Sequence, residues 1–388
     1  MRDSLTTESL ISATVYNKAN LVGTSTNSFG FYSLTLPEGK VELVYSYVGY
    51  HAQTVSFNLR RDTVINVSLA GTLHLKEVTV TAGRASRIQE TTQMSAISVP
   101  MTQIKSLPAF LGEVDLLKVL QMMPGVQSGG EGNSGLYVRG GGPDQNLFLL
   151  DGLPMYNVSH LFGFFSVFNA DAINSMEVIK GGFPARYGGR VSSVLDISMK
   201  EGNMQKFGVE GSIGIVSAKL MLEGPIVKDK TSFIITGRRS HNDAMANSLI
   251  SLDKGQTSEK GTTNYYFYDL TAKINHRFSA NDRIYLSAYM GDDKYSMQNR
   301  YTSDNDTVSI NYRTDGGIKW GNSAVAFRWN HIFTPQLFSN TSISYSRYRY
   351  NNWSEKDYTE KTIDYKETPP VTNTYRDYYN FLMFRTPS

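Results

Sequence analysis

The chain contains no cysteine, and it lacks any apolar run long enough to cross a membrane as a helix. The first absence excludes disulfide bonds and thiolate metal sites. The second absence excludes a membrane-spanning helix, because the longest apolar stretches, such as Leu161–Phe168, are far shorter than the ~20 residues that such a helix needs. Membrane-spanning β-strands stay possible, since the signal of each such strand is weak. The polar start Met1–Thr6 does not have the pattern of a signal peptide.

A strong net charge is also missing, because 38 basic residues face 35 acidic ones. Nucleic-acid binding depends mainly on neutralising phosphates, so the net charge of +3 gives no reason to expect a nucleic-acid partner. No zinc-ligand spacing and no catalytic constellation occurs, and His51 stands alone in its region. We therefore expect no metal, no cofactor and no enzymatic activity.

What is present favours β-structure. The 388 residues allow two or three domains, and they include 24 tyrosines and 19 phenylalanines, which fit pleated surfaces. Sixteen of the tyrosines and all three tryptophans follow residue 260, so the last third is expected to have a different environment.

Residues 11–69 predict a small β-sandwich, because short alternating runs are separated by turn residues. The expected strands are Ile11–Asn17, Gly30–Leu36, Lys40–Tyr50 and Asp62–Leu69. This segment resembles the carboxypeptidase-regulatory-like domain, a transthyretin-like sandwich. That family usually begins with one further strand, so we expect its first strand to be missing here and Met1 to be an internal start or the edge of a fragment.

Residues 73–92 contain the β-branched run Glu77–Ala82, followed by polar sequence. Two interpretations are open from spacing alone. The run is the last strand of the preceding domain with a linker, or it is an extended segment offered to the sheet edge of a partner.

Residues 93–205 predict a mixed α/β region. Val114, Leu117, Leu120 and Met123 recur at a helical period before Pro124-Gly125 ends the helix. We expect a second, short helix around Ala172–Met176, then a strand at Met176–Ile179 and a final strand before Gly202.

From residue 206 onward the chain predicts long amphipathic strands, six or seven of them between Phe207 and Phe384. In Tyr266–Phe278 the even positions are mostly apolar, and the odd positions include Asp269 and Lys273. Such runs, with short turns at one end and long polar loops at the other, are typical of outer-membrane barrels, whereas a soluble sandwich with one wet face is the alternative. We expect the long loops at Ser251–Asn264 and Asp292–Ser309. An open sheet of this size leaves edges bare, so we expect the barrel to continue beyond Ser388.

Five motifs in order resemble the plug of a TonB-dependent outer-membrane transporter. They are Pro124-Gly125-Val126, Arg139-Gly140, Asp151-Gly152-Leu153-Pro154, Glu177-Val178-Ile179-Lys180-Gly181 and Tyr187-Gly188. The joint match is specific, although each motif alone is weak. The glycines are expected to allow positive φ and close backbone approach inside a barrel. A phosphate cradle is the other interpretation of this glycine-rich run, but the G-K-[ST] ending of a P-loop is missing.

The resemblance implies a mainly β chain with three parts: a transthyretin-like β-sandwich, an α+β plug and the first strands of an antiparallel transmembrane β-barrel. The expected divisions are 1–72 for the sandwich, 73–92 for a linker with the Ton box, 93–205 for the plug and 206–388 for the barrel. It also implies that Glu77, Val78, Thr79, Val80 and Thr81 form the Ton box that pairs with TonB. Arg139 and Glu177 are candidates for ion pairs between plug and barrel wall.

By the same resemblance, the implied function is active import of a nutrient across the outer membrane, with the N-terminal domain in the periplasm. Siderophore, haem, cobalamin, peptide and glycan ligands all fit. A glycan importer of the SusC-like group would act with a surface lipoprotein, but "VLQMMPGVQS" departs from that group's pattern. The aromatic stretch Tyr345–Trp353 is expected in a membrane-interface girdle or in sugar stacking. An adhesin or other surface-binding β-sandwich protein is the remaining alternative.

Overall fold

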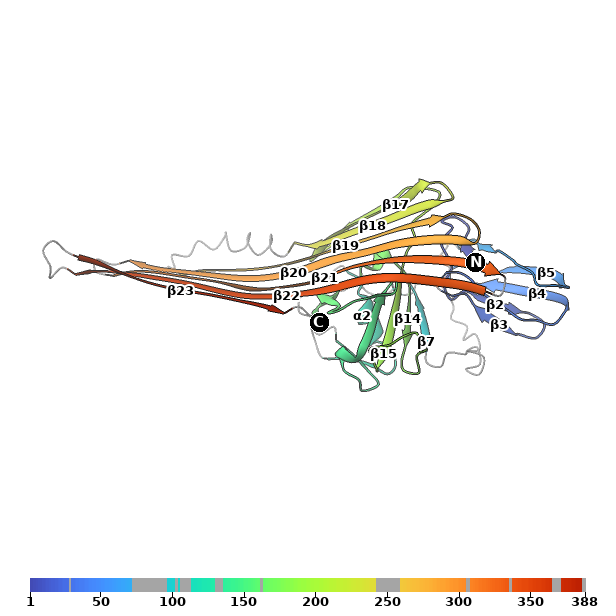
Figure 1. Ribbon diagram of the computed structural model, residues 1–388, viewed down its shortest axis with the longest axis horizontal. Coiled ribbons are helices and arrows are strands. Elements are labelled where there is room, and N and C mark those ends of the chain that lie inside the picture. Colours follow the sequence, from blue (N-terminus) through green and yellow to red (C-terminus); the bar gives the residue numbers. More distant parts are fainter. Residues whose placement is uncertain are drawn as a thin grey trace.

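The computed structural model describes residues 1–27, 29–71, 96–101, 104, 113–129, 135–160, 163–241, 259–304, 308–334, 337–364 and 371–385. Three parts are visible in Figure 1: an N-terminal domain at one end, a central mixed region around α2, β7, β14 and β15, and a large curved sheet that covers one side of this region. We call the central region the plug and the large sheet the wall.

The N-terminal domain is built on a four-stranded sheet in the order β3-β2-β4-β5. The strands are β2 (Thr14–Asn17), β3 (Gly23–Ser25), β4 (Gly39–Ser46) and β5 (Gln53–Leu59), and a parallel pair joins β1 (Arg2–Asp3) to β6 (Ser68–Leu69). The strand expected at Gly30–Leu36 is wrong, and of the strand expected at Asp62–Leu69 only Ser68–Leu69 forms. Tyr32, Leu34 and Leu36 pack against the domain core, but the backbone joins no sheet. Alternation there reflects packing on a core rather than a ladder of backbone hydrogen bonds.

The plug contains a five-stranded sheet in the order β11-β10-β15-β14-β7. Its strands are β7 (Ala96–Pro100), β10 (Asn146–Leu150), β11 (Leu153–Pro154), β14 (Ile173–Ile179) and β15 (Ser193–Met199). Two short pairs accompany it: β8 (Val126–Ser128) with β9 (Leu136–Val138), and β12 (Ser159–His160) with β13 (Phe165–Ser166).

The described part of the plug contains only short helical segments. The predicted helix is confirmed as α2 (Leu116–Gln121), whose buried Leu116, Leu117 and Leu120 face the core. The second expected helix is wrong: a 3₁₀ turn, η3, covers only Ala170–Ala172, and Ser175 and Met176 lie in β14. Both side chains are buried between neighbouring strands, so sheet packing overrides the local pattern. A further 3₁₀ turn, η1, covers Pro143–Gln145.

The wall is an antiparallel sheet of eight strands in sequence order, with β16 and β23 at its edges. The strands are β16 (Gly208–Ile213), β17 (Ser217–Val227), β18 (Thr231–Ser240), β19 (Glu259–Arg277), β20 (Asp282–Asp304), β21 (Val308–Thr334), β22 (Leu337–Asp364) and β23 (Val371–Arg385). The expected count of six or seven is therefore too low. The short β16 contains Gly208 and Gly211, which weaken the strand pattern.

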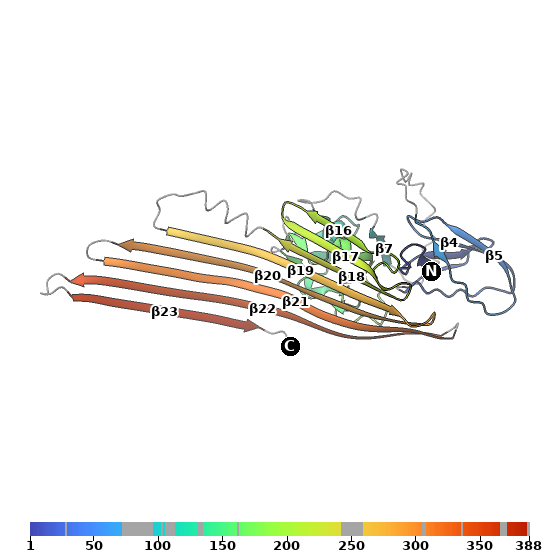
Figure 2. The same ribbon diagram turned by 90° about the horizontal axis from the view of Figure 1, so that it is seen from above.

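The long loop predicted at Asp292–Ser309 is also wrong. β20 continues to Asp304 and β21 begins at Val308, and their ladder pairs Asp304 with Ser309. The end of the other expected loop, Glu259–Asn264, is likewise strand. Figure 2 shows that β20–β23 extend well past the plug, away from the N-terminal domain. The polar sequence here therefore continues as paired strand rather than forming loops.

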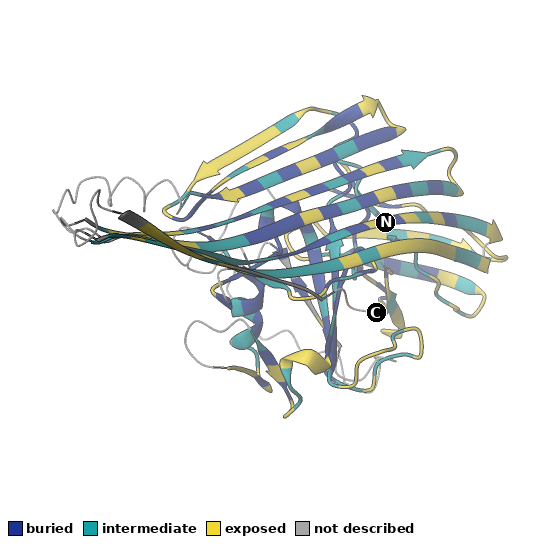
Figure 3. Ribbon diagram, turned by 60° about the vertical axis from the view of Figure 1, so that its left-hand side comes forward, coloured by how far each residue is buried: buried dark blue, intermediate teal, exposed yellow. Residues whose placement is uncertain are grey.

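The wall strands bury polar side chains and expose apolar ones, which is the reverse of the pattern in a soluble sheet. We call this the inverted pattern. On β19 the polar Asp269, Lys273 and Asn275 are 3%, 3% and 0% exposed, whereas the apolar Leu270 and Ile274 are each 42% exposed. The face turned to the plug is therefore polar and the outer face is apolar. Buried and exposed bands alternate along the middle strands of the wall, β17–β21, in Figure 3. In the described part of the chain, no helix is long and apolar enough to cross a membrane.

Candidate functional site

The candidate site is the interface between plug and wall, where charged side chains are almost fully buried. Five described ion-paired groups join the two parts: His160 with Asp269 and Asp293, Glu113 with Arg238, Asp151 with Lys273, Glu201 with Arg283, and Asp171 with Lys219. All but the last contain side chains that are less than a tenth exposed. Removing one partner of such a buried pair leaves an uncompensated charge and typically costs about 3–5 kcal/mol.

His160, on the short strand β12, is held between two carboxylates of the wall. Its Nδ1 lies 2.6 Å from Asp293 Oδ2, and its Nε2 lies 2.8 Å from Asp269 Oδ1. The imidazole also stacks on Phe267, with ring centroids 4.2 Å apart. Burial alone would lower the pKa of His160, but the two carboxylates outweigh it and raise the pKa to about 9. His160 is therefore a cation at neutral pH, and both ring nitrogens donate.

Arg238 of β18 extends this cluster to the helix of the plug. Its guanidinium donates to Asp269 of the wall, to Glu113 at 2.8 Å and to the backbone oxygen of Ser166 at 2.7 Å. Asp115, two residues after Glu113, caps α2 by accepting from the backbone of Leu117 at 2.9 Å. One buried arginine thus fixes the start of α2 and the β12–β13 pair against the same wall strand.

Asp151 is the centre of a second cluster. Its carboxylate lies 2.8 Å from Lys273 Nζ and accepts from Ser287 Oγ at 2.7 Å and from the backbone of Met199 at 2.9 Å. Arg328 donates to its backbone oxygen. Burial opposes ionisation, but Lys273 and Arg328 dominate and lower the pKa of Asp151. The carboxylate is therefore charged and paired with the wall.

Two of the glycine motifs form turns with the predicted positive φ, but the predicted close approach of other backbone is wrong for them: a Cβ at Gly140 would meet nothing within 4 Å, and one at Gly152 only the Arg328 side chain. Arg139-Gly140 and Asp151-Gly152 each place two consecutive residues at positive φ, at 49° and 86° and at 52° and 81°. Glycine relieves the strain at the second position of each turn. The turn at Asp151 aims its carboxylate into the wall, so this motif residue contributes to the interface directly.

The other predicted motif residues act within the plug. Lys180 donates to the backbone oxygen of Pro124 at 2.6 Å, and Tyr187 donates to Asp196 at 2.9 Å. Gly181 has φ of 86° next to the Arg139 guanidinium, whereas Gly188 has no positive φ and open space around it. Glu177 is half-buried in the middle of β14, where burial and then Asp196 raise its pKa. Ion pairs of Arg139 and Glu177 with the wall stay predictions.

The residues predicted to form the Ton box, Glu77–Thr81, lie outside the described residues. Sequence reasoning missed His160, Glu113, Arg238 and Glu201 as interface residues. Charged residues at the plug-facing positions of the wall strands were a usable signal for this interface, because buried charges need partners of opposite charge. Their partners lie up to 133 residues away in the sequence, which no local pattern reveals.

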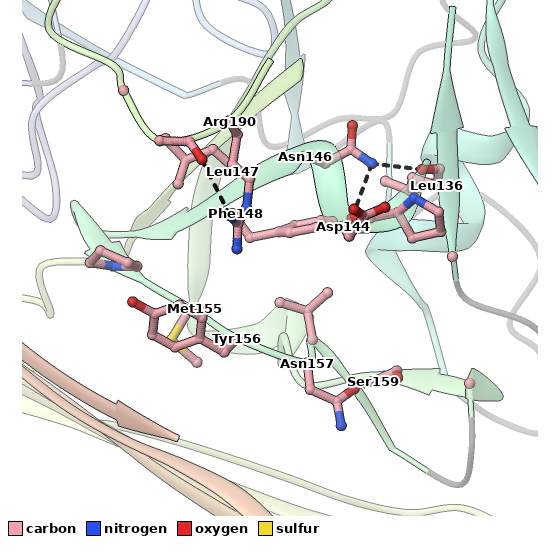
Figure 4. Close-up of a pocket in the computed structure, with 17 residues that line it drawn as sticks. Leu136, Asp144, Asn146, Leu147, Phe148, Met155, Tyr156, Asn157, Ser159 and Arg190 are labelled. Atoms are coloured by element: carbon pink, nitrogen blue, oxygen red, sulfur yellow. Dashed lines mark hydrogen bonds between the residues drawn. The ribbon is translucent and has the colours of Figure 1, made fainter. Parts of the chain in front are cut away.

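A cavity of about 520 Å³ opens in the plug. Arg190 and Phe148 lie on one side of it, and Tyr156 and Asn157 on the other (Figure 4). Asn157 also contacts the wall, since its side-chain nitrogen donates to Tyr348 Oη at 3.3 Å. Among the described residues, no group of three or more His, Asp or Glu side chains could hold a metal ion.

Comparison with known proteins identifies the class. Residues 88–193 match the TonB-dependent receptor plug domain, and residues 1–80 match the CarboxypepD_reg-like domain. TonB-dependent receptor P39 from Formosa agariphila is 30% identical over 199 residues, which are 48% of this chain and 18% of that protein. The chain therefore carries a plug domain of the TonB-dependent receptors, preceded by a carboxypeptidase-regulatory-like domain. Members of this family are outer-membrane β-barrel proteins.

Two solved structures show weaker similarity. The siderophore receptor PirA from Acinetobacter baumannii is 13% identical, with 76% of this chain and 58% of that chain covered and a TM-score of 0.41. A mutant of the ferric enterobactin receptor from Pseudomonas aeruginosa is also 13% identical, with 76% and 60% covered and a TM-score of 0.39. The chain thus spans less than two thirds of these structures, and they do not bear on its ligand.

Proposed function

We propose that this chain takes part in active import of a nutrient across the outer membrane, with the N-terminal domain in the periplasm and TonB as the source of force. No bond of the nutrient is made or broken. The observation that carries the proposal is the charged plug–wall interface beneath an apolar outer face. A sheet with this inverted pattern fits lipid outside and a plugged lumen inside.

The interface acts as a gate held by electrostatics. Buried pairs such as His160–Asp269 and Asp151–Lys273 have fixed partners, and separating them exposes charges that must be rehydrated. Spontaneous opening is therefore rare, and an external source of energy is needed to move the plug. A non-transporting adhesion protein has no need for such a lock, so we favour import over that alternative.

The position of β7 suggests how force enters the plug. It is the first described element after the Ton box, and it forms one edge of the plug sheet, paired with β14. Tension on residues 77–81 would therefore reach an edge strand first. Detaching one strand breaks fewer contacts at a time than moving the whole plug.

The Ton box is tested with Val80→Pro in the full-length receptor. Proline removes a backbone donor and so disrupts strand addition to TonB. We expect binding of the purified TonB C-terminal domain to fall at least tenfold, and nutrient uptake to be lost with ligand binding retained. Val80→Ala, which keeps the donor, is the matched control. Unchanged TonB binding and uptake in Val80→Pro would reject this assignment.

The ligand is proposed only as a class of nutrient: siderophore, haem, cobalamin, peptide or glycan. A deletion strain grown on each of these sources would identify the class through the source that no longer supports growth. If glycans are that source, a surface lipoprotein co-purifying with the receptor would support the SusC-like alternative. Growth unchanged on every source would contradict import of these nutrients.

A further inference from the structure

The N-terminal domain contacts the plug through its first turn. Thr6 accepts a hydrogen bond from the backbone of Met204 at 3.3 Å, and the Glu8 carboxylate accepts one from the backbone of Glu201 at 2.6 Å. The backbone oxygen of Ser9 faces the Asn174 side chain at 3.5 Å. These contacts come from the ends of β14 and β15 and from the connection that leads into the wall.

The same turn reaches the wall. Arg283 of β20 donates to Ser9 Oγ at 3.3 Å and to Asn275 at 2.7 Å, and its Nη2 lies 2.8 Å from Glu201 Oε2. Ser9, Glu201 and Arg283 are 1%, 5% and 7% exposed. The domain is therefore in contact with a buried polar centre that also joins plug and wall.

Aromatic side chains make a second contact with the wall. The rings of Phe29 and Phe31 lie 5.6 Å and 5.2 Å from the ring of Phe338, near the turn between β21 and β22. The guanidinium of Arg328 lies 5.3 Å from the Phe29 ring, and it also donates to the backbone of Asp151. The apolar and polar contacts thus support the same orientation of the domain. Figure 1 shows the domain next to the end of the wall where β21 turns into β22.

We propose that the N-terminal domain is docked on the plug and the wall in the folded receptor and is not a freely tethered module. We call the contact the domain seat; on the domain it is made by Thr6, Glu8, Ser9, Phe29 and Phe31. Burial, followed by the neighbouring Glu201 carboxylate, raises the pKa of Glu8 to about 7. A partly protonated Glu8 limits the repulsion between the two carboxylates, as expected of a packed interface. The docking does not depend on which nutrient is imported.

Cysteine pairs test the docking directly, because the full chain contains no cysteine. Thr6→Cys with Met204→Cys should form a disulfide under mild oxidation, since the hydrogen bond between the two backbones puts them within the usual Cα separation of about 4–7 Å. Val64→Cys with Met204→Cys is the control, because Val64 is an exposed residue of the same domain. Efficient cross-linking of the first pair alone supports the seat. Equal yields for the two pairs, or no cross-link, would overturn it.

Hydrogen exchange of the full-length receptor gives an independent readout. Phe338→Asp changes the wall and leaves the domain's own sequence intact. We expect the protection factors of the Glu201 and Met204 amides to fall at least tenfold, because both donate into the domain. Val64→Asp adds the same charge to the domain surface and should leave them unchanged. Unaltered protection in Phe338→Asp would contradict docking.

Discussion

His160 shows how one residue can hold a plug in place. The imidazole is 1% exposed and has an acceptor on each ring nitrogen, so its charged form is favoured in the folded state. Neither neighbouring carboxylate belongs to the plug, and both would be left without this partner if β12 moved away. The protonated imidazole of His160 therefore joins the plug to two strands of the wall.

The charge of His160 predicts a pH dependence. Its pKa rises from the ordinary value of 6.5 to about 9 in the folded state, so its contribution to stability is complete below pH 6.5 and is lost as the pH rises through about 9. The loss amounts to roughly 3 kcal/mol at most, from 1.36 kcal/mol per pKa unit. His160→Gln, which hydrogen-bonds but cannot be charged, should be less stable below pH 6.5 and should lack this dependence.

Equilibrium unfolding of the detergent-solubilised receptor from pH 6 to pH 10 measures this difference, with wild type and His160→Gln treated in parallel. Identical pH profiles for the two proteins would show that His160 does not carry the charge assigned to it.

At the scale of elements, the inverted wall strands are what separates this chain from a soluble β-protein. Apolar residues such as Leu270, Ile274, Leu286 and Phe327 are 42–47% exposed on neighbouring strands and share the outer face. A contiguous apolar face of this kind needs a partner, and lipid is the partner proposed here.

Ile274→Arg tests the environment of that face. At an exposed position in water, the change should alter stability by no more than about 0.5 kcal/mol. Facing the middle of a bilayer, it should cost about 2–4 kcal/mol, whereas Phe278→Arg at the strand end should cost about 0–1 kcal/mol. Unfolding of the full-length receptor in lipid vesicles would measure both. A cost for Ile274→Arg no larger than for Phe278→Arg would argue against lipid contact.

Much of the wall and of the helix was predictable, because period-2 and period-3.6 patterns report which face of an element is buried. The alternation in Tyr266–Phe278 and the helix around Leu117 illustrate this. Strand ends and ladders were less predictable: Gly30–Leu36 alternates without pairing, and polar sequence after Asp292 continues as strand. In the interface, Asp151 was found through its turn motif, whereas His160 depends on tertiary contacts with residues more than 100 positions away.

At the scale of the whole molecule, the three parts meet at one end of the wall. If the domain is docked, residues 72–95 connect two fixed points, the domain at Gly71 and the plug at β7. A pull on the proposed Ton box would then act on both attachments, and the plug would be released at the weaker one. The buried pairs of the interface determine how much force that requires.

The most direct test of the proposed gate is to lock the plug to the wall and follow uptake. The Asn322 side chain donates to the backbone oxygen of Tyr156 at 2.6 Å and accepts from the backbone nitrogen of Tyr156 at 3.3 Å. The two residues are therefore neighbours across the interface, and we expect Tyr156→Cys with Asn322→Cys to form a disulfide in the full-length receptor. Each single cysteine variant is the control for lost side-chain contacts. The assay is growth on the nutrient identified by the deletion strain.

We predict that the oxidised pair still binds the nutrient but does not support growth, and that a reductant restores growth to the level of the single variants. Uptake at the wild-type rate with the disulfide fully formed would contradict the claim that the plug must move away from this wall.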